Sequence, residues 1–412
     1  MIGNFAVTIN GENIDNSRIH SLSETGTVSS GNAVVNGILI NYGSTVTMYN
    51  NFIANLLAPN VNLTDAIRGI NIATFFTSNT TYNLYYNSIY INASTTGANF
   101  GTTGVYHNDN ATSTTVRLTM NDNIIVNTST PKGTGSTIAF WNSGTTLGNY
   151  ITSSDNNLFY AGTPAANRLV YYDGTNSDQA LATFQARVNP REANSISLMP
   201  AFTSSTDLHL TSTNCLLDNQ GAPVAGITTD IDGATRDVTT PDIGADEFSA
   251  SLNTTLAGIA GTAVCAYRTV SASGTTFSSN TCDLIAKVAS SGADPVAGKV
   301  NACVTLDATQ QYFNAEPFVQ RHYDIEPLTS NTTTTSATIT LYFTDAEFAN
   351  FNTNNPAWPK LPTVAGGGNA DPNKANLKVT QYHGTPTTTP STPGNYTANA
   401  GSGTYINPND AN

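Results

Sequence analysis

The chain has 412 residues, of which 10% are charged and 39% are hydrophobic, and its formal net charge is −13. An acidic chain with 15 lysines and arginines and no basic cluster is a poor partner for nucleic acid. No stretch approaches the roughly 18 apolar residues of a membrane span. Composition therefore predicts a folded protein of two or three domains, without a membrane span and without a nucleic-acid partner.

A unit of roughly 35 residues recurs over the first part of the chain, and each unit carries three short apolar strands. The first strands begin at Gly37, Gly69, Gly104 and Thr137. The third strands align Phe52, Ile89, Ile124 and Leu158, at spacings of 37, 35 and 34 residues. Short strands in fixed order with polar corners are typical of a parallel β-solenoid, whose stacked coils bury one shared apolar column. We expect five to six coils over residues 1–190.

Alternation along each strand predicts which side chains point inward. The inward set is Ile38, Ile40, Ile70, Ile72, Ile138 and Phe140 in the first strands, and Phe52, Ala54, Ile89, Ile91, Ile124, Val126, Leu158 and Tyr160 in the third. His107 also takes an inward position. A hydrogen-bonded core histidine and a strand with locally reversed facing both remain open for it.

Asparagines stand at the corners on both sides of the third strands. A corner asparagine can bond its own turn and the equivalent asparagine of the next coil, which builds a ladder. We therefore assign a structural role to Asn50, Asn87, Asn156, Asn55, Asn92 and Asn127.

Four aromatic side chains alternate onto the outer surface: Tyr85, Tyr90, Tyr106 and Trp141. Aromatic rings among asparagines and threonines suit stacking on sugar rings, and ordinary cross-strand packing is the other interpretation. The loops after the third strands vary in length, and the edge they share is a natural place for a binding surface.

Residues 177–188 change to helical spacing at Leu181, Phe184 and Val188, which predicts a short helix over the end of the column. Residues 191–250 follow as a closing segment with an acidic cluster: Asp230, Asp232, Asp242, Asp246 and Glu247, with Arg236 among them. Oxygen ligands at this density can hold calcium. The alternative is that Arg236 pairs with Asp242 or Glu247 and pins the segment to the last coil.

The chain changes character after residue 250. Residues 251–262 are expected to be a linker, and residues 263–412 carry the strands of a β-sandwich without a closing strand, which predicts an incomplete domain. The cysteines are Cys215, Cys265, Cys282 and Cys303. A Cys265–Cys282 disulfide is the first choice, and buried free thiols are the alternative.

The coils resemble the right-handed parallel β-helix of pectate-lyase-like proteins. The sequences from Asp230 to Arg236 and from Pro241 to Phe248 look like the closing segment of exported bacterial surface β-helix proteins with a "choice-of-anchor" region. RHYDIEP and ATITLYFTDAEF resemble the β-sandwich of type IX secretion substrates. The resemblance implies an extracellular or cell-surface parent protein. The expected signal peptide and sorting domain are missing from this sequence, so we expect a longer parent chain.

Enzymes of the pectate-lyase-like fold usually cleave acidic polysaccharides, with clustered or paired carboxylates and a basic side chain. The acids and bases of the coils, Asp65, Asp109, Asp122, Asp155, Arg68, Arg117, Lys132 and Arg168, do not fall into register. We assign no catalytic residue and no cofactor other than a candidate calcium ion. The leading hypothesis is a non-catalytic surface or adhesin-type segment that binds glycans. The alternatives are a polysaccharide lyase or glycoside hydrolase, favoured by an Asp/Arg cluster in one groove, and a pure spacer.

Overall fold

The structure is a computed structural model. It describes residues 13–31, 33–41, 45–73, 80–109, 116–258, 260–271, 273–313, 315–328, 335–363, 371–381 and 404–406. The chain forms two compact units, Met1–Ala250 and Ser251–Asn412, and each is described by itself.

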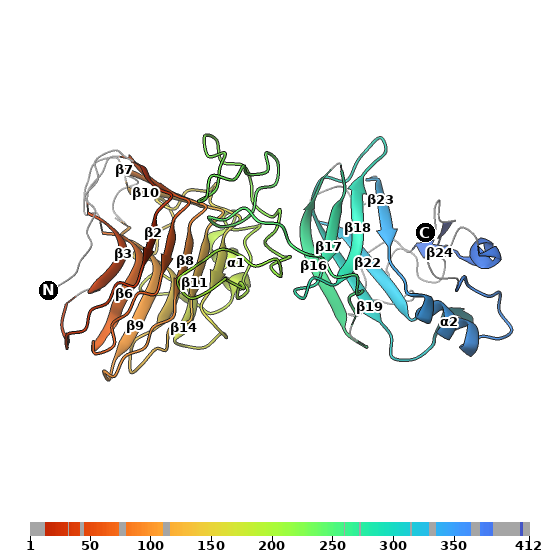
Figure 1. Cartoon of the computed structure of the whole chain (residues 1–412), viewed down its shortest axis with the longest axis horizontal. Helices are drawn as coiled ribbons and strands as arrows, with labels where there is room; N and C mark the ends of the chain where they lie inside the picture. The colour runs from red at the N-terminus through yellow and green to blue at the C-terminus, as the bar shows by residue number, and fades with distance from the viewer. Residues whose placement is uncertain are drawn as a thin grey trace. The chain divides into compact units, whose positions relative to one another are not determined.

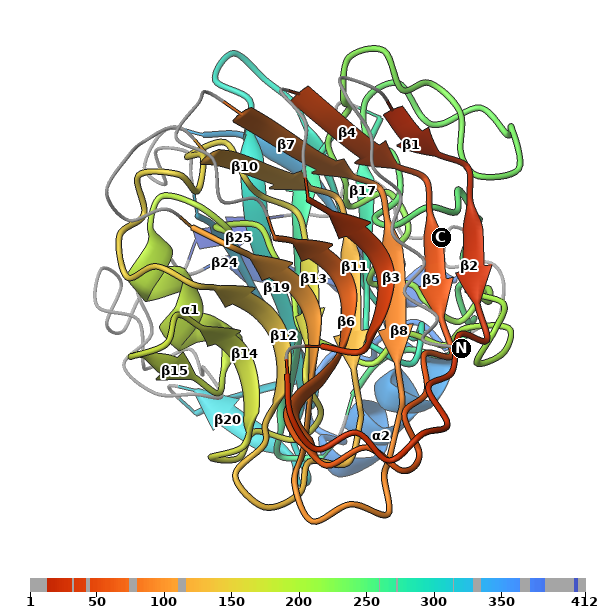
Figure 2. The same cartoon turned by 90° about the vertical axis from the view of Figure 1, so that its left-hand side faces the viewer.

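The first unit is a parallel β-solenoid of about four turns, as the repeat predicts (Figure 1). The repeat predicted five to six coils, and a partial turn at the C-terminal end, where two of the three sheets gain a further strand, adds to the four. Three sheets run along it, and their strands stack coil upon coil (Figure 2). Sheet I consists of β1 (Asn13–Asp15), β4 (Thr45–Tyr49), β7 (Thr80–Tyr85) and β10 (Val116–Asn121). Sheet II consists of β2 (Arg18–His20), β5 (Phe52–Ala54), β8 (Ser88–Ile91), β11 (Ile124–Asn127) and β13 (Leu158–Tyr160). Sheet III consists of β3 (Val35–Ile40), β6 (Leu63–Ile72), β9 (Phe100–His107), β12 (Thr137–Asn142), β14 (Arg168–Tyr172) and the antiparallel β15 (Ser177–Asp178).

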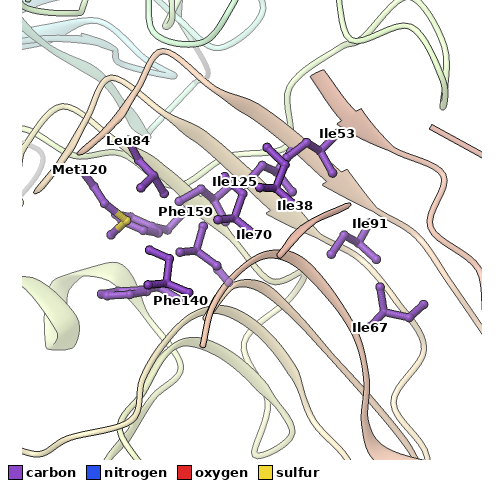
Figure 3. Close-up of a cluster of buried hydrophobic side chains, with 14 of the residues drawn as sticks. Ile38, Ile53, Ile67, Ile70, Leu84, Ile91, Met120, Ile125, Phe140 and Phe159 are labelled. Atoms are coloured by element: carbon purple, nitrogen blue, oxygen red, sulfur yellow. The ribbon is translucent and has the colours of Figure 1, made fainter. Parts of the chain in front are cut away.

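The interior of the solenoid is a dry column of aliphatic and aromatic side chains (Figure 3). Ile53, Ile89, Ile125 and Phe159 occupy one row of sheet II, because parallel pairing sets like positions side by side. Each of these four side chains is 0% exposed. The inward prediction is confirmed for Ile38, Ile40, Ile70, Ile72, Phe140, Ile89 and Ile91.

The inward prediction is wrong for most of the third strands. Phe52 pairs with Ser88, and Ser88 pairs with Ile124, so the predicted alignment of Ile89 with Phe52 and Ile124 is off by one residue. Phe52, Ala54, Ile124, Val126, Leu158 and Tyr160 face away from the column. They pack instead against the closing segment, through Leu208, Leu210, Leu217, Ile231 and Ile243. Sheet II is therefore apolar on both faces, and its strands lack the alternation that would reveal their facing.

The first strands contain a similar shift at β12. Ala139, not Thr137, aligns with Gly104, because Ile138 pairs with Thr103 and Phe140 with Val105. Ile138 therefore lies in the outward row and not in the column, contrary to the prediction. A Cβ atom on Gly104 would lie 2.5 Å from Cγ2 of Ile125 and 2.6 Å from the carbonyl oxygen of Ala139. The glycine is needed because sheets II and III approach closely there.

The corner asparagines form two rows and not one. The buried row is Asn51, Asn87, Asn123 and Asn157, and each side-chain amide donates to the next along the column at 2.9 Å. The other row, Asn50, Tyr86, Asp122 and Asn156, has positive φ angles of 52°, 52°, 60° and 57°. Asn and Asp adopt this conformation more readily than other non-glycine residues. Asn87 thus belongs to the ladder, while Asn50 and Asn156 form tight turns.

The asparagines after the third strands do not continue the ladder. Asn127 is buried and donates to the carbonyl oxygens of Thr102 and Ile138. Asn55 donates to Ser21 Oγ of the preceding coil. Asn92 is exposed, and it does not align with Asn127, because Asn127 pairs with Ile91.

The predicted helix is α1 (Leu181–Val188). The ring centroid of its Phe184 lies 4.7 Å from that of Tyr171 and 5.3 Å from that of Phe159 in the last coil. The closing segment does not stay at the last coil. It runs along the outer face of sheet II, where Tyr86 donates to the carbonyl oxygen of Ala222 and Arg18 of β2 pairs with Asp232. The solenoid is thus held together along its side as well as through its core.

The second unit contains two three-stranded antiparallel sheets that fit a partial β-sandwich. One consists of β16 (Ala263–Val270), β19 (Gly298–Leu306) and β22 (Arg321–Pro327), and the other of β17 (Thr275–Ser278), β18 (Leu284–Ser290) and β23 (Ala337–Leu341). The remaining elements are β20 (Gln311–Phe313), β21 (Glu316–Phe318), α2 (Asp345–Asn354), η1 (Pro372–Asn376), β24 (Val379–Gln381) and β25 (Thr404–Ile406). Most of the tail beyond residue 381 lies outside the described residues, so its predicted strand pattern is not assessed in full.

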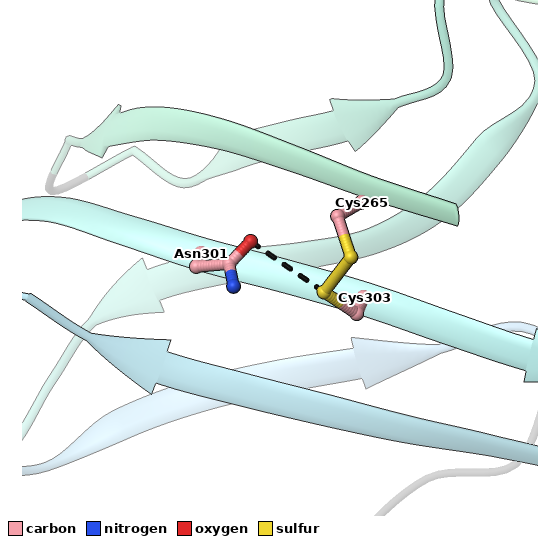
Figure 4. Close-up of a disulfide and its surroundings, with 3 residues drawn as sticks. All are labelled: Cys265, Asn301 and Cys303. Carbon is pink, nitrogen blue, oxygen red and sulfur yellow. Dashed lines mark hydrogen bonds between the residues drawn. A yellow bond between two sulfur atoms is a disulfide. The ribbon is translucent and has the colours of Figure 1, made fainter. Parts of the chain in front are cut away.

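Two details of the second unit differ from expectation. Cys265 forms a disulfide with Cys303 and not with Cys282, because β16 and β19 place the two cysteines directly opposite each other (Figure 4). Their Cα atoms are 4.0 Å apart. The segment expected to be a linker packs against this unit, since the N–H of Ala257 bonds Leu284 and that of Gly261 bonds Leu306. Among the residues described, no helix has the length and apolar composition to cross a lipid bilayer.

Candidate functional site

The outer face of sheet III carries a row of aromatic side chains. Tyr106 pairs with Trp141, and Trp141 with Tyr172, so one ring follows another from coil to coil. The ring centroids are 5.2 Å apart for Tyr106 and Trp141, and 5.1 Å apart for Trp141 and Tyr172. All three side chains are partly exposed. Tyr172 was not among the residues predicted for this surface, and the pairing of β14 with β12 places it in the row.

A buried arginine lies beside this aromatic row. The guanidinium carbon of Arg68 lies 3.3 Å from the ring centroid of Tyr106, within cation–π range. Its Nε and Nη2 donate to Asp65 at 3.0 and 2.5 Å, and its Nη1 donates to Asn71 at 2.9 Å. Arg68 is 7% exposed. Burial raises the pKa of Asp65, although the nearby Arg68 opposes this shift.

The strand bend at Gly69 brings these groups together. Gly69 and Ile70 both face the interior, where a Cβ on Gly69 would lie 2.7 Å from Cγ2 of Ile89. Arg68 and Asn71 flank this pair, and their side chains meet on the outer face. The result is a surface of partly exposed rings beside buried amides, in which the guanidinium of Arg68 and the carboxylate of Asp65 neutralise each other. Such a surface suits stacking and hydroxyl recognition.

The four predicted aromatic residues do not form one face. Tyr106 and Trp141 belong to the row described above. Tyr85 lies on sheet I, in register with Tyr49, and is partly exposed there. Tyr90 lies on sheet II, packed at 5.5 Å from Phe202 of the closing segment. Tyr90 faces outward as predicted, but the closing segment that covers it could not be foreseen from alternation.

Three of the five predicted calcium ligands, Asp230, Asp242 and Glu247, hold turns of the closing segment, and Glu247 accepts the backbone N–H groups of Asp237 and Asp242. Asp230 accepts the backbone N–H groups of Asp232, Ala234 and Glu247, and Asp242 accepts those of Asn219 and Phe248. Burial, followed by the Glu247 charge, raises the pKa of Asp242 to about 8. These carboxylates already have hydrogen-bond donors in the closing segment.

Arg236 is buried beside this turn network. It pairs with Glu247 at 3.2 Å, donates to Asn50 Oδ1 at 2.9 Å, and lies over the ring of Tyr86 at 4.0 Å. Arg236 therefore joins the closing segment to the corners of the second and third coils, and not to the last coil as expected. A polar pocket of about 460 Å³ opens next to it, lined by Asp218, Asp237, Glu247 and Phe248 among others.

The other two predicted ligands, Asp232 and Asp246, lie with His209. One ligand atom from each of the three residues falls within 4.8 Å of the others. Spacing along the chain does not reveal this group, because Asp232 and Asp246 follow His209 by 23 and 37 positions. The signal that could have found it is local: in DLHL, Asp207 stands two residues before His209 and on the same side of the segment.

His107 is a fully buried, hydrogen-bonded histidine of sheet III. Its Nδ1 lies 2.7 Å from Asn142 Oδ1, and its Nε2 lies 3.1 Å from the carbonyl oxygen of Val116. Burial lowers its pKa. It aligns with Ile72 and Asn142, and not with Phe140 as expected. These contacts match the core-histidine interpretation.

Comparison of the chain with protein-family models, with curated proteins and with solved structures found no match. Its function is therefore argued from the geometry of these surfaces.

Proposed function

We propose that the chain is a non-catalytic, glycan-binding segment of an extracellular surface protein, and that the outer face of sheet III is its binding surface. The observation that carries the proposal is the row Tyr106–Trp141–Tyr172, in which rings follow one another in the three consecutive coils of β9, β12 and β14. A glycan chain lying along the solenoid axis would meet a new ring at each step. Asn71 continues the row next to Tyr106, and its buried amide holds Arg68 and donates to Asn36 of the neighbouring strand.

The composition and the disulfide support an extracellular location. Charge is scarce, and uncharged asparagine, threonine and serine cover the exterior. The Cys265–Cys303 disulfide is of a kind that persists in oxidising compartments. The resemblance to exported surface β-helix proteins and type IX secretion substrates also supports an extracellular location. Fractionation of the native host, with detection of the chain at the surface or in the medium, tests this part of the proposal.

Replacing Trp141 with Ala is expected to weaken glycan binding about tenfold, because the central ring of the row is lost. A glycan array identifies the ligand, and titration calorimetry then compares the variants. Tyr85→Ala is the matched control, since Tyr85 is a partly exposed aromatic residue of sheet I. Equal weakening in both variants, or no glycan bound by the wild type, would contradict the proposed surface and favour a spacer.

A polysaccharide lyase or hydrolase is the second candidate, because Asp65 and Arg68 lie beside the aromatic row. A carboxyl with a raised pKa is what a general acid requires. Against it, the Arg68 guanidinium is engaged by Asp65, Asn71 and Tyr106. The described strands of sheet III carry two carboxylates, Asp65 and Asp178, and each is paired with an arginine, Arg68 and Arg187 respectively, whereas hydrolysis needs an acid and a base that act on one bond.

The enzyme candidate predicts that Asp65→Asn lowers turnover of an acidic polysaccharide by about 100-fold or more. Asp155→Asn is the control, because Asp155 lies at a corner where it accepts from Asn194. Turnover is followed by the unsaturated product or by new reducing ends. Absence of turnover by the wild type across such substrates excludes this candidate and leaves glycan binding without catalysis.

A further inference from the structure

Residues from four separate stretches of the first unit meet around His209. Asp207 and His209 come from one strand-like stretch, Asp232 from the DIDG turn, Asp246 from the end of the closing segment, and Arg18 from β2. Leu208 and Leu210, on either side of His209, are buried against sheet II and fix the backbone. The ring of His209 lies edge-on to Phe52 at 4.9 Å. The imidazole is thus held in one orientation.

The two ring nitrogens of His209 have different surroundings. Nδ1 contacts the carboxylate of Asp207, and Nε2 lies 2.6 Å from Asp232 Oδ2. A carboxylate on one ring nitrogen and a ligand position at the other is the arrangement that orients metal-binding histidines. Asp246 is held next to the ring because its Oδ2 accepts the N–H of Leu210 at 2.7 Å.

We propose that His209 Nε2, Asp232 and Asp246 form a binding site for a first-row divalent cation such as Zn²⁺, with Asp207 orienting the imidazole. Imidazole with two carboxylates suits zinc better than calcium, which takes six to eight oxygen ligands. Tetrahedral zinc lies about 2.0 Å from each of its ligand atoms. The three ligand atoms here are up to 4.8 Å from one another, so they must move modestly closer together to bind the ion. Asp232 can supply it, because its side chain is 48% exposed.

The local charge favours a cation. Asp207, Asp232 and Asp246 face one guanidinium, that of Arg18, so two negative charges remain unbalanced when His209 is neutral. A bound divalent ion would balance them. It would also cross-link the stretches of the closing segment that carry His209, Asp232 and Asp246.

Titration of the full chain with Zn²⁺ alone tests the site, with Ca²⁺ and Mg²⁺ as separate arms. We expect one Zn²⁺ per chain, a rise in melting temperature with zinc concentration, and visible absorption of a tightly bound Co²⁺ substitute. His209→Gln should abolish binding, and Asp207→Asn should weaken it about tenfold. His20→Gln is the matched control, because His20 lies in β2 and contacts Ser21.

Arg18→Met gives a result that loss of folding cannot imitate. Removing the guanidinium frees Asp232, so Zn²⁺ should bind about threefold more tightly. Asp232→Asn changes an exposed side chain and should weaken binding without unfolding the unit. The proposal is overturned if wild type binds no Zn²⁺, if His209→Gln binds as wild type does, or if Ca²⁺ binds equally well and independently of His209. Each of these results leaves the glycan proposal standing.

Discussion

Ile89→Asp is expected to destabilise the solenoid by about 4–5 kcal/mol and to lower its melting midpoint by about 10–20 °C. Ile89 is 0% exposed and lies between Ile53 and Ile125 in the column. A carboxylate placed there loses its water and gains no partner among the aliphatic side chains around it. Urea denaturation followed by circular dichroism measures the loss.

Thr45→Asp is the control for this variant. Thr45 is an exposed residue of β4, so the change carries the same poor strand propensity of aspartate without burial. Its free energy of unfolding should stay within about 1 kcal/mol of the wild type. If Ile89→Asp had the same free energy of unfolding as Thr45→Asp, the column would not be the apolar interior.

Ile124→Asp extends the same experiment to the outer face of sheet II. Ile124 is 0% exposed because Leu217 and Ile243 of the closing segment cover it. We expect Ile124→Asp to lower the free energy of unfolding nearly as much as Ile89→Asp does. A nearly neutral Ile124→Asp would show that the closing segment does not pack along the side of the solenoid.

Glu192→Gln is expected to flatten the dependence of stability on pH between about pH 4.5 and 7. Glu192 ends the asparagine ladder: it is 0% exposed and accepts from Asn157, Tyr150 and Ser195. Burial is the main cause that raises its pKa to about 7. The amide of glutamine has no proton to lose in this range.

The sign follows from which state holds the proton. Between about pH 4.5 and 7 the folded chain keeps the Glu192 proton and the unfolded chain releases it, so stability falls as pH rises through this window. The stabilising contribution is complete below about pH 4.5 and lost above about pH 7. This contribution of Glu192 to the free energy of unfolding is about 3 kcal/mol in the wild type, and it is absent in the variant.

Urea denaturation at half-unit steps from pH 4.5 to 8.5 measures this effect. Asp242, whose pKa is raised to about 8, adds a slope of the same sign, so the difference between variant and wild type isolates Glu192. Glu24→Gln is the matched control: Glu24 accepts from Gly26 in a loop of the first coil. A variant with the wild-type slope would mean that Glu192 is ionised in the folded state throughout.

The ladder explains why a carboxylate stands at its end. Each asparagine amide donates forward, from Asn51 to Asn87, Asn123 and Asn157, so the last amide needs an acceptor. Asparagines at a period of about 35 residues could be read from the sequence. Which of two adjacent asparagines pointed inward could not, because Asn50 and Asn51 differ in backbone conformation and not in chemistry.

The repeat of short apolar strands determined the solenoid, since stacked coils are the arrangement that buries such strands, and it also determined the aliphatic column around Ile89. Tertiary structure decided the rest. The register of strands joined by two-residue corners cannot be inferred when a strand such as β11 is apolar on both faces, and burial of its second face depends on residues some 90 positions later. The meeting of His209 with Asp232 and Arg18 depends on the path of the closing segment along sheet II, and Tyr172 joins Trp141 through strand pairing. Local periodicity carries no information about contacts made across such distances in the chain.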